Sequence, residues 1–256
     1  MGMNTENEAL FEALQRITDI MKAAVRKYEP CFGSFFDAET VAALRGRFCP
    51  EEGTECGFYG GYDGAERCMF GAWPEYESED IYARFPLELL EVTCPPQGKL
   101  SHRDCLGALL GLGIKREMLG DILCDERLFY VFASSKISDY IAANLNKIGN
   151  AGVRIRKISV AEFVAPKPKV QIKGIFIMSN RLDAVLSGAL DLSRAKAAEL
   201  VRAERVSVNH ALKTDVSLKV NTGDLLSVRG FGRFRVGDEG NKSRKGRTYL
   251  EIIKYI

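Results

Sequence analysis

The sequence predicts an α+β fold in three consecutive parts. A helical N-terminal region is followed by a ferredoxin-like (RBD-like) middle domain and by a C-terminal domain of two short helices and a small β-sheet. Three observations predict this fold: a helical periodicity of apolar residues near the N-terminus, a β-α-β-β-α-β order of elements in the middle, and a change of charge after residue 165. We place the three parts at residues 1–78, 79–165 and 166–256.

The change of charge is the clearest compositional signal. Residues 166–256 carry 18 Lys and Arg against 9 Asp and Glu, a formal charge of +9, whereas residues 1–165 carry −7. Chance clustering is one explanation, and a module that binds a polyanion such as nucleic acid is the other. The whole chain, with 256 residues of which 46% are hydrophobic and 27% charged, has a globular composition that excludes fibrous and disordered classes.

The N-terminal region is expected to begin with one long helix over residues 6–28. Its apolar residues recur at three- and four-residue steps, and Glu29-Pro30 ends the pattern. A second helix is expected after Asp37, which is a typical N-cap residue. The glycine- and tyrosine-rich stretch 57–67 predicts a strand, a turn and the start of another element.

The middle part alternates strands and helices. A helix should start at Ser101, with Ser101 and Asp104 forming a reciprocal capping pair, and a second should start at Ser135 and end near Gly149. The expected strands are residues 81–93, 118–124, 128–133 and 153–160. Their order is that of the split β-α-β fold, which RNA-binding domains and unrelated domains share.

The C-terminal part follows a proline- and lysine-rich linker at residues 165–169. Two short helices are expected at residues 181–190 and 193–203, the second with Ser193 as its N-cap. The remaining expected elements are strands at residues 171–178, 225–229, 231–236 and 248–255.

The second short helix carries a basic face. If residues 193–205 form one helix, Arg194, Arg202 and Arg205 fall within an arc of about 80°. No carboxylate of this segment lies in that arc, and Glu199 is just outside it. Arginine suits phosphate because its planar guanidinium donates two parallel hydrogen bonds. A solvated charged face is the alternative interpretation.

A second basic cluster is predicted at a hairpin tip. Residues 241–247 hold four basic side chains and no acidic one, and a mobile tip of this kind can follow a phosphate backbone. Nearby, Phe231 and Phe234 are interleaved with arginines at positions 229, 233 and 235. These rings either stack on bases or, as is more usual for strand residues, belong to the core.

Four motifs in the C-terminal part closely resemble the S-four RNA-binding domain, first described in a small-subunit ribosomal protein. They are Arg181-Leu182-Asp183, Leu192-Ser193-Arg194, Val206-x-Val208-Asn209 and Gly223-Asp224-x-x-Ser227-Val228. Upstream motifs extend the resemblance over nearly the whole chain to the YlmH family of bacterial proteins. They are Gly60-Gly61-Tyr62-x-x-Ala65-Glu66-Arg67, the leucine- and glycine-rich run from His102 to Arg116, Gly120-Asp121-Ile122 and the run from Ser227 to Arg233.

The resemblance implies a non-enzymatic RNA-binding protein of the translation machinery. Such proteins associate with the large ribosomal subunit holding a stalled peptidyl-tRNA, in ribosome-associated quality control. There the S-four domain contacts ribosomal RNA and tRNA. The family is also linked to cell division, and one branch to photosystem II. The basic clusters and the resemblance together give the expected RNA-binding residues Arg181, Arg194, Lys196, Arg202, Arg205, Asn209, Lys213, Arg229, Arg233, Lys242, Arg244 and Lys245.

The sequence departs from the S-four pattern at three positions. Glu204 stands where relatives often have the glycine that ends the second helix, and Ser207 and Ala211 stand where they often have lysine. A residue at the glycine position is expected to adopt the left-handed conformation, with mild strain for a side chain other than glycine.

Two short segments resemble parts of enzyme active sites. His102-Arg103-Asp104 resembles a kinase catalytic loop, but Leu109 occupies the position where asparagine is required. Residues 240–243 resemble the end of a phosphate-binding loop, but Asn241 interrupts the motif. A pseudouridine synthase is the main enzyme alternative, because some of these enzymes carry S-four domains. Those usually place the domain before a large catalytic domain, whereas here it is C-terminal. A protein-interaction adaptor is the third class.

Cysteines and the N-terminus suggest a cytoplasmic location. The seven cysteines show no C-x-x-C spacing, so neither a zinc site nor a disulfide framework is expected. The polar first residues do not resemble a secretion signal, and no apolar run is long enough to span a membrane. We expect no cofactor, no membrane partner and a monomer whose partners are structured RNA and the large ribosomal subunit.

Overall fold

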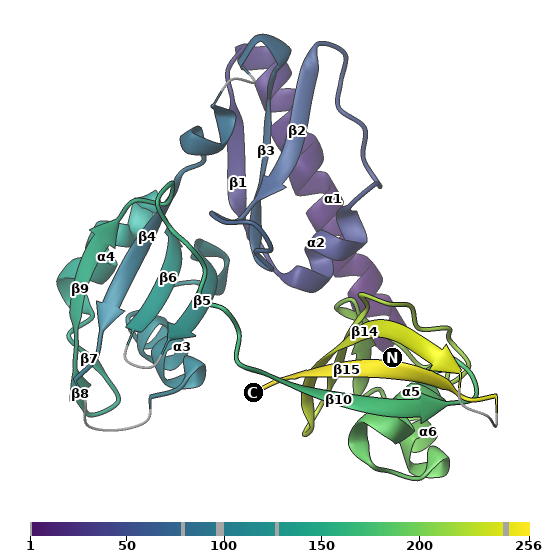
Figure 1. Cartoon of the computed structure of the whole chain (residues 1–256). Helices are drawn as coiled ribbons and strands as arrows, with labels where there is room; N and C mark the ends of the chain where they lie inside the picture. The colour runs from purple at the N-terminus through teal and green to yellow at the C-terminus, as the bar shows by residue number, and fades with distance from the viewer. Residues whose placement is uncertain (1, 78–79, 96–99, 126–127, 243–245) are drawn as a thin grey trace. The chain divides into compact units, whose positions relative to one another are not determined.

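The computed structural model describes residues 2–77, 80–95, 100–125, 128–242 and 246–256. The chain divides into two compact units, Met1–Pro166 and Lys167–Ile256 (Figure 1). Helices and antiparallel sheets occur in both units, so the expected α+β class is confirmed. Among the residues described, no helix combines the length and the apolar character needed to cross a membrane.

The N-terminal part is one long helix and one short helix on a three-stranded sheet. Helix α1 (Gly2–Lys27) and helix α2 (Ala38–Leu44) pack against strands β1 (Cys31–Phe36), β2 (Thr54–Tyr59) and β3 (Cys68–Pro74), which follow the order β1-β3-β2. Both expected helices are confirmed. The carboxylate of Asp37 accepts a hydrogen bond from the Thr40 amide at 2.8 Å, which is the expected N-cap.

Two strands of this sheet were not predicted. All seven residues of β3 are buried, because β3 is the central strand and α1 covers it, so its sequence shows no alternation of polar and apolar residues. Strand β1 pairs with β3 through an irregular register between Phe32 and Phe35, which also interrupts a period of two.

The middle part has the predicted ferredoxin-like topology. Its elements are β4 (Leu87–Thr93), α3 (His102–Gly111), β5 (Leu119–Asp125), β6 (Leu128–Ser134), α4 (Ser135–Asn144) and β9 (Arg154–Ile158). The four strands form an antiparallel sheet in the order β5-β6-β4-β9. The predicted capping box is confirmed: the Ser101 hydroxyl accepts from the Asp104 amide, and the Asp104 carboxylate accepts from the Ser101 amide.

Three details differ from the sequence prediction. Residues Ile81–Arg84 form a 3₁₀ helix, η2, and the strand begins only at Leu87, after Pro86. The N-cap of α4 is Ser134 rather than Ser135. Helix α4 ends at Asn144, because a short hairpin of β7 (Lys147–Ile148) and β8 (Ala151–Gly152) follows, with Gly149 in its turn at φ 57°. A further 3₁₀ turn, η3, covers Arg116–Met118.

Asp121 joins the N-terminal and middle parts of the first unit. Its buried carboxylate accepts hydrogen bonds from the Tyr62 hydroxyl at 2.7 Å and from the amides of Glu66 at 2.8 Å and Arg67 at 3.0 Å. The preceding residue, Gly120, is approached so closely that a Cβ atom there would lie 2.7 Å from the Phe35 ring. The motif of residues 60–67 and the motif of residues 120–122 therefore meet at one contact.

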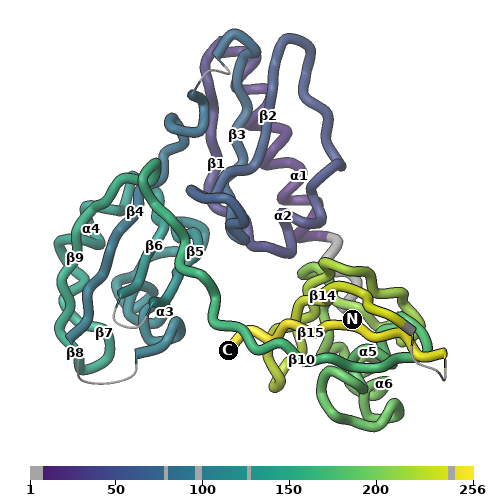
Figure 2. Tube along the Cα trace, in the orientation of Figure 1, coloured from purple at the N-terminus to yellow at the C-terminus, as the bar shows by residue number. Residues whose placement is uncertain are grey.

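The C-terminal unit is a six-stranded antiparallel sheet with two helices on one side (Figures 1 and 2). Its strands follow the order β10-β15-β14-β13-β11-β12, which is a larger sheet than the small one predicted. The elements are β10 (Val170–Ile177), α5 (Leu182–Leu190), α6 (Arg194–Arg202), β11 (Val206–Val208), β12 (Ala211–Leu212), β13 (Leu225–Val228), β14 (Gly232–Lys242) and β15 (Thr248–Tyr255).

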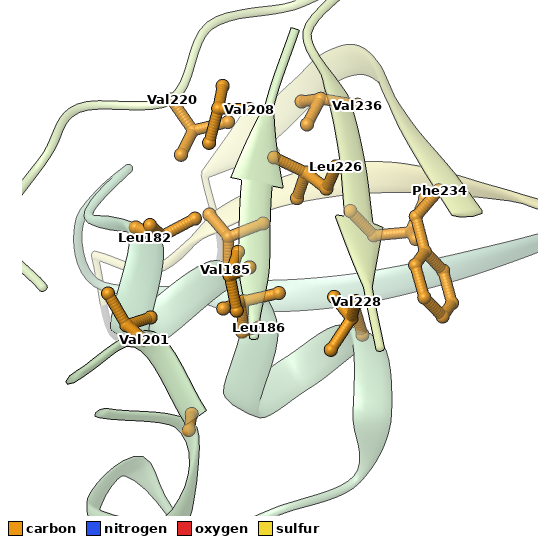
Figure 3. Close-up of a cluster of buried hydrophobic side chains, with 14 of the residues drawn as sticks. Leu182, Val185, Leu186, Val201, Val208, Val220, Leu226, Val228, Phe234 and Val236 are labelled. Carbon is orange, nitrogen blue, oxygen red and sulfur yellow. The ribbon is translucent and has the colours of Figure 1, made fainter. Parts of the chain in front are cut away.

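A single hydrophobic core holds the helices on this sheet (Figure 3). Leu182 and Leu186 of α5 and Val201 of α6 are fully buried, and they pack on strand residues such as Leu226 and Phe234. The helices leave their other faces free for polar side chains, and those faces carry the candidate site.

Replacing Asp121 by Asn should destabilise the first unit. An amide offers one acceptor oxygen where the carboxylate offers two, so at least one buried donor loses its partner, at a cost of about 2–3 kcal/mol. Urea unfolding followed by fluorescence of Trp73, the sole tryptophan, measures this unit directly because Trp73 is buried there. The matched control is Asp125→Asn, an exposed position on the same strand, which should change stability little. Equal effects of the two substitutions would contradict this role of Asp121.

Candidate RNA-binding surface

Helix α6 begins where the sequence predicts and ends earlier. The Ser193 hydroxyl accepts from the Lys196 amide at 3.3 Å, as expected of an N-cap. The helix stops at Arg202, because Glu204 adopts the left-handed conformation with φ 55°, as its place at the glycine position predicts. The Glu204 and Arg205 amides then bond back to the carbonyls of Val201 and Leu200, both at 3.1 Å.

The expectation that Arg205 shares a helical face with Arg194 and Arg202 is therefore wrong. Beyond the left-handed residue the chain turns toward strand β11 and carries Arg205 to the turn between β13 and β14. There the Arg205 guanidinium donates to the Arg229 carbonyl at 2.8 Å, and the Arg229 amide donates to the Arg205 carbonyl at 2.9 Å. Arg205 is thus a fixed part of the wall between α6 and this turn.

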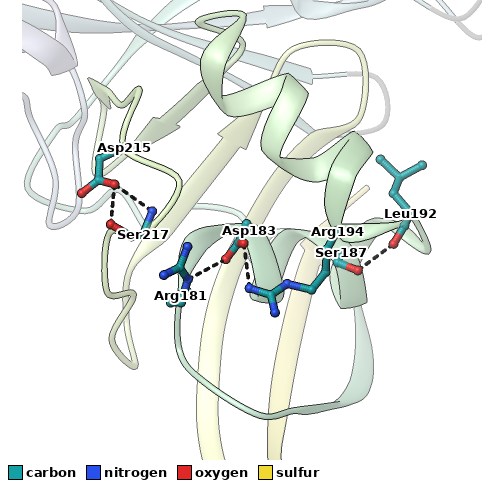
Figure 4. A network of polar contacts seen from close by, with 7 residues as sticks. All are labelled: Arg181, Asp183, Ser187, Leu192, Arg194, Asp215 and Ser217. Atoms are coloured by element: carbon teal, nitrogen blue, oxygen red, sulfur yellow. Dashed lines mark hydrogen bonds and ion pairs between the residues drawn. The ribbon is translucent and has the colours of Figure 1, made fainter.

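Arg194 has a carboxylate partner that the helical arc of α6 did not reveal. Its Nη2 lies 2.7 Å from Oδ2 of Asp183, and Nε of Arg181 lies 3.2 Å from the other oxygen (Figure 4). Asp183 comes from the first turn of α5 and is buried, while both arginine side chains remain half-exposed. Burial raises the pKa of Asp183, but hydrogen bonds and charge from Arg194 and Arg181 outweigh it and hold the pKa below its ordinary value.

Lys196 and Arg202 remain as exposed cations of α6. Neither forms an ion pair or a side-chain hydrogen bond within the part of the chain that the structure describes. These two residues lie on opposite flanks of the buried stripe of the helix. Arg202 is on the same flank as Arg194, and Lys196 is about 120° from Arg202 around the helix axis. Exposed cations of this kind, with no partner among the described residues, are the groups that neutralise phosphates.

The side chain of Asn209 forms hydrogen bonds within the protein. It lies in the turn after β11 with φ 50°, and its amide donates to the Asp224 carboxylate at 2.8 Å. Its side-chain oxygen accepts from the Leu225 amide at 2.9 Å. Both polar groups of Asn209 therefore hold two turns together, and the resemblance alone did not indicate this.

The remaining expected residues are distributed around the sheet. Arg229 is exposed in the turn before β14, Arg233 is half-buried on β14, and Lys213 is half-buried after β12. Lys242 ends β14, whereas Arg244 and Lys245 lie outside the described residues, so the expected hairpin tip is described only at its flanks.

The two phenylalanines of this region have different environments. Phe234 is buried in the core, with 2% of its surface exposed, as strand residues usually are. Phe231 lies in the turn before β14, and 36% of its surface is exposed. Phe231 is therefore the ring that solvent and ligands reach. Within the described ranges, no group of three or more His, Cys, Asp or Glu is placed to hold a metal ion.

Comparisons with known proteins identify two domains in this chain. Residues 81–162 match the family described as a putative RNA-binding domain in YlmH, and residues 180–226 match the S4 domain, the S-four module. The ribosome-associated protein quality control protein P2 of Bacillus subtilis (strain 168) is 36% identical over 189 residues, which cover 73% of each chain.

A solved structure shares the fold. The cell division protein ylmH from Streptococcus pneumoniae superimposes with a TM-score of 0.50 at 20% identity, covering 62% of this chain and 94% of that one. At this identity the likeness concerns architecture alone.

Replacing Asp183 by Asn should destabilise the C-terminal unit in a pH-dependent way. The substitution leaves two arginines with a neutral partner, which at pH 7 costs about 1–3 kcal/mol. Because the folded pKa of Asp183 is lowered, the ionised carboxylate stabilises the fold above the ordinary value of 3.8, and this stabilisation disappears as pH falls through the lower folded pKa. The difference between the variant and the unaltered protein should therefore close in that acidic window.

Urea unfolding monitored by NMR cross-peaks of residues 182–202 isolates this unit. Asp191→Asn is the matched control, because Asp191 ends the same helix and forms an exposed ion pair with Lys173. That variant should lose less than about 0.5 kcal/mol. A difference for Asp183→Asn that stayed constant through the acidic window would contradict the assigned ion pairs.

Proposed function

Because the chain belongs to the YlmH family, a family of RNA-binding proteins, we propose that it docks through its S-four domain on RNA of the large ribosomal subunit. The observation that carries this proposal is that Lys196 and Arg202 on α6 are exposed and have no ion-pair partner among the described residues, in the same pair of helices that presents the half-exposed guanidiniums of Arg181 and Arg194. These four groups lie on elements whose backbone is fixed by caps and by a buried core, so they are presented to phosphates in a constant geometry.

The cellular process that we propose is ribosome-associated quality control. The Bacillus relative bears that process in its name, and its similarity extends over most of both chains. We propose that the S-four domain contacts ribosomal RNA and tRNA on a large subunit that holds a stalled peptidyl-tRNA. The protein would then act in the cytoplasm, by binding and without catalysis.

The two units differ in charge in a way that supports this division of work. The +9 of residues 166–256 attracts RNA, whereas the −7 of residues 1–165 disfavours broad contact of that part with phosphates. Within that part the negative charge belongs to residues 1–78, since residues 79–165 hold 11 Lys and Arg against 11 Asp and Glu. The neutral middle part, which matches a putative RNA-binding domain, would contact a limited stretch of RNA or a protein surface.

Replacing Lys196 and Arg202 together by Gln should weaken RNA binding and its dependence on salt. Each cation that neutralises a phosphate releases counterions, which makes log K fall as log salt rises. Removing one such cation should therefore make this negative slope shallower by about 1. Fluorescence anisotropy with a labelled ribosomal RNA hairpin, between about 50 and 200 mM KCl, measures both the affinity and the slope. Co-sedimentation with large subunits tests the partner.

The matched control is Lys22→Gln. Lys22 is an exposed lysine of α1, which lies outside both matched domains and outside the proposed surface. It should leave affinity and slope unchanged. Arg194 is unsuitable for a charge reversal, because a carboxylate there would face buried Asp183. Salt-independent binding by the unaltered protein would refute the electrostatic account, and unchanged binding by the double variant would place the RNA elsewhere.

A further inference from the structure

An open hollow lies between α6 and the turn that joins β13 to β14. Its volume is about 480 Å³, and its walls have three kinds of surface. Leu192 and Leu200 provide an aliphatic wall, Phe231 provides an aromatic one, and Lys196, Glu199 and Arg205 bring charged groups to the rim. The hollow lies wholly within the C-terminal unit.

The walls of this hollow are fixed by backbone contacts. Arg205 is bonded to the carbonyl of Arg229 through its guanidinium and to Leu200 through its amide. Gly230 has φ 89°, and a Cβ atom there would lie 3.1 Å from Nη2 of Arg205, so the turn and the arginine fit closely. The Phe231 amide donates to the Val228 carbonyl at 3.0 Å, which anchors the residue that carries the ring. Because the segments around the hollow are already ordered, ligand binding costs little conformational entropy of the protein.

We propose that this hollow receives one unpaired guanine base of the bound RNA, a proposal that rests on the function proposed above. Protein recognition of RNA sequence targets unpaired bases that stack on aromatic side chains. Phe231 supplies a partly exposed ring, and Lys196 and Arg205 supply cations for the phosphates on either side of such a base. An apolar peptide would leave these charged groups without partners.

Glu199 is the reason to expect guanine. A carboxylate has two acceptor oxygens and no donor. Guanine alone among the four bases presents two adjacent donors on its Watson–Crick edge, the N1–H and the N2 amino group. Adenine and cytosine each present a donor beside a ring nitrogen that accepts, and the carboxylate repels that nitrogen. Glu199 is exposed and unpaired within the described part of the chain, so its carboxylate is available to the base.

The test uses the full chain and a set of fluorescein-labelled RNA hairpins that differ in one bulged nucleotide: guanosine, inosine, adenosine or an abasic site. Phosphate contacts are common to the set, so differences in affinity report the base. The guanosine hairpin should bind about tenfold more tightly than the abasic one, the size of one base–aromatic stack. Phe231→Ala should abolish this preference, and Phe231→Tyr should retain it.

Two further variants make the test specific. Glu199→Ala, which removes both acceptor oxygens at this exposed position, should remove the preference for guanosine over inosine, which lacks the N2 amino group, even where loss of a negative charge tightens binding of every hairpin. Phe176→Ala, which removes another exposed phenylalanine of the same unit away from the hollow, should leave all preferences unchanged.

The outcomes separate this proposal from the function on which it rests. Salt-dependent binding with equal affinity for guanosine and abasic hairpins overturns the guanine site and leaves the proposed function intact. Retention of the preference by Phe231→Ala also overturns the site. Failure of the unaltered protein to bind any hairpin, or large subunits, overturns both.

Discussion

A buried carboxylate shared by two guanidiniums sets the geometry of the C-terminal unit. Asp183 belongs to the first turn of α5, and Arg194 is the first residue of α6, so their contact ties the starts of both helices together. A buried charge is tolerated only when it is paired and hydrogen-bonded, which makes this contact hard to rearrange. This pairing and the hydrophobic core together set the orientation of α6, and with it the position of every cation on that helix.

The cations of the basic surface differ in whether they also hold the fold together. Arg181 and Arg194 hold the architecture and still expose part of their guanidiniums, whereas Arg202 and Lys196 make no such contact within the described residues. Arg205 is a third case, since its guanidinium closes the wall beside Phe231. The formal charge of +9 therefore overstates the charge that a phosphate meets at any one place.

Local sequence signals predicted the local structure well. They could not predict contacts between segments that are distant in the sequence. The caps at Asp37, Ser101 and Ser193 and the left-handed Glu204 follow from backbone chemistry within a few residues, and all four are confirmed. A helical wheel of one segment contains no information about Asp183 on the neighbouring helix. The buried strand β3 likewise lacks the alternation by which strands are recognised, because both its faces are covered.

Glu204 shows how one local departure shapes the site. A continuing helix would have placed Arg205 beside Arg194 and Arg202, on a single phosphate-binding face. The left-handed residue instead turns the chain, and Arg205 meets the turn that carries Phe231. Arg205 is therefore absent from the face of α6 and instead lines a hollow, together with the ring of Phe231 and the carboxylate of Glu199. The end of α6 thereby converts part of a purely electrostatic surface into a place where shape and hydrogen bonding discriminate between ligands.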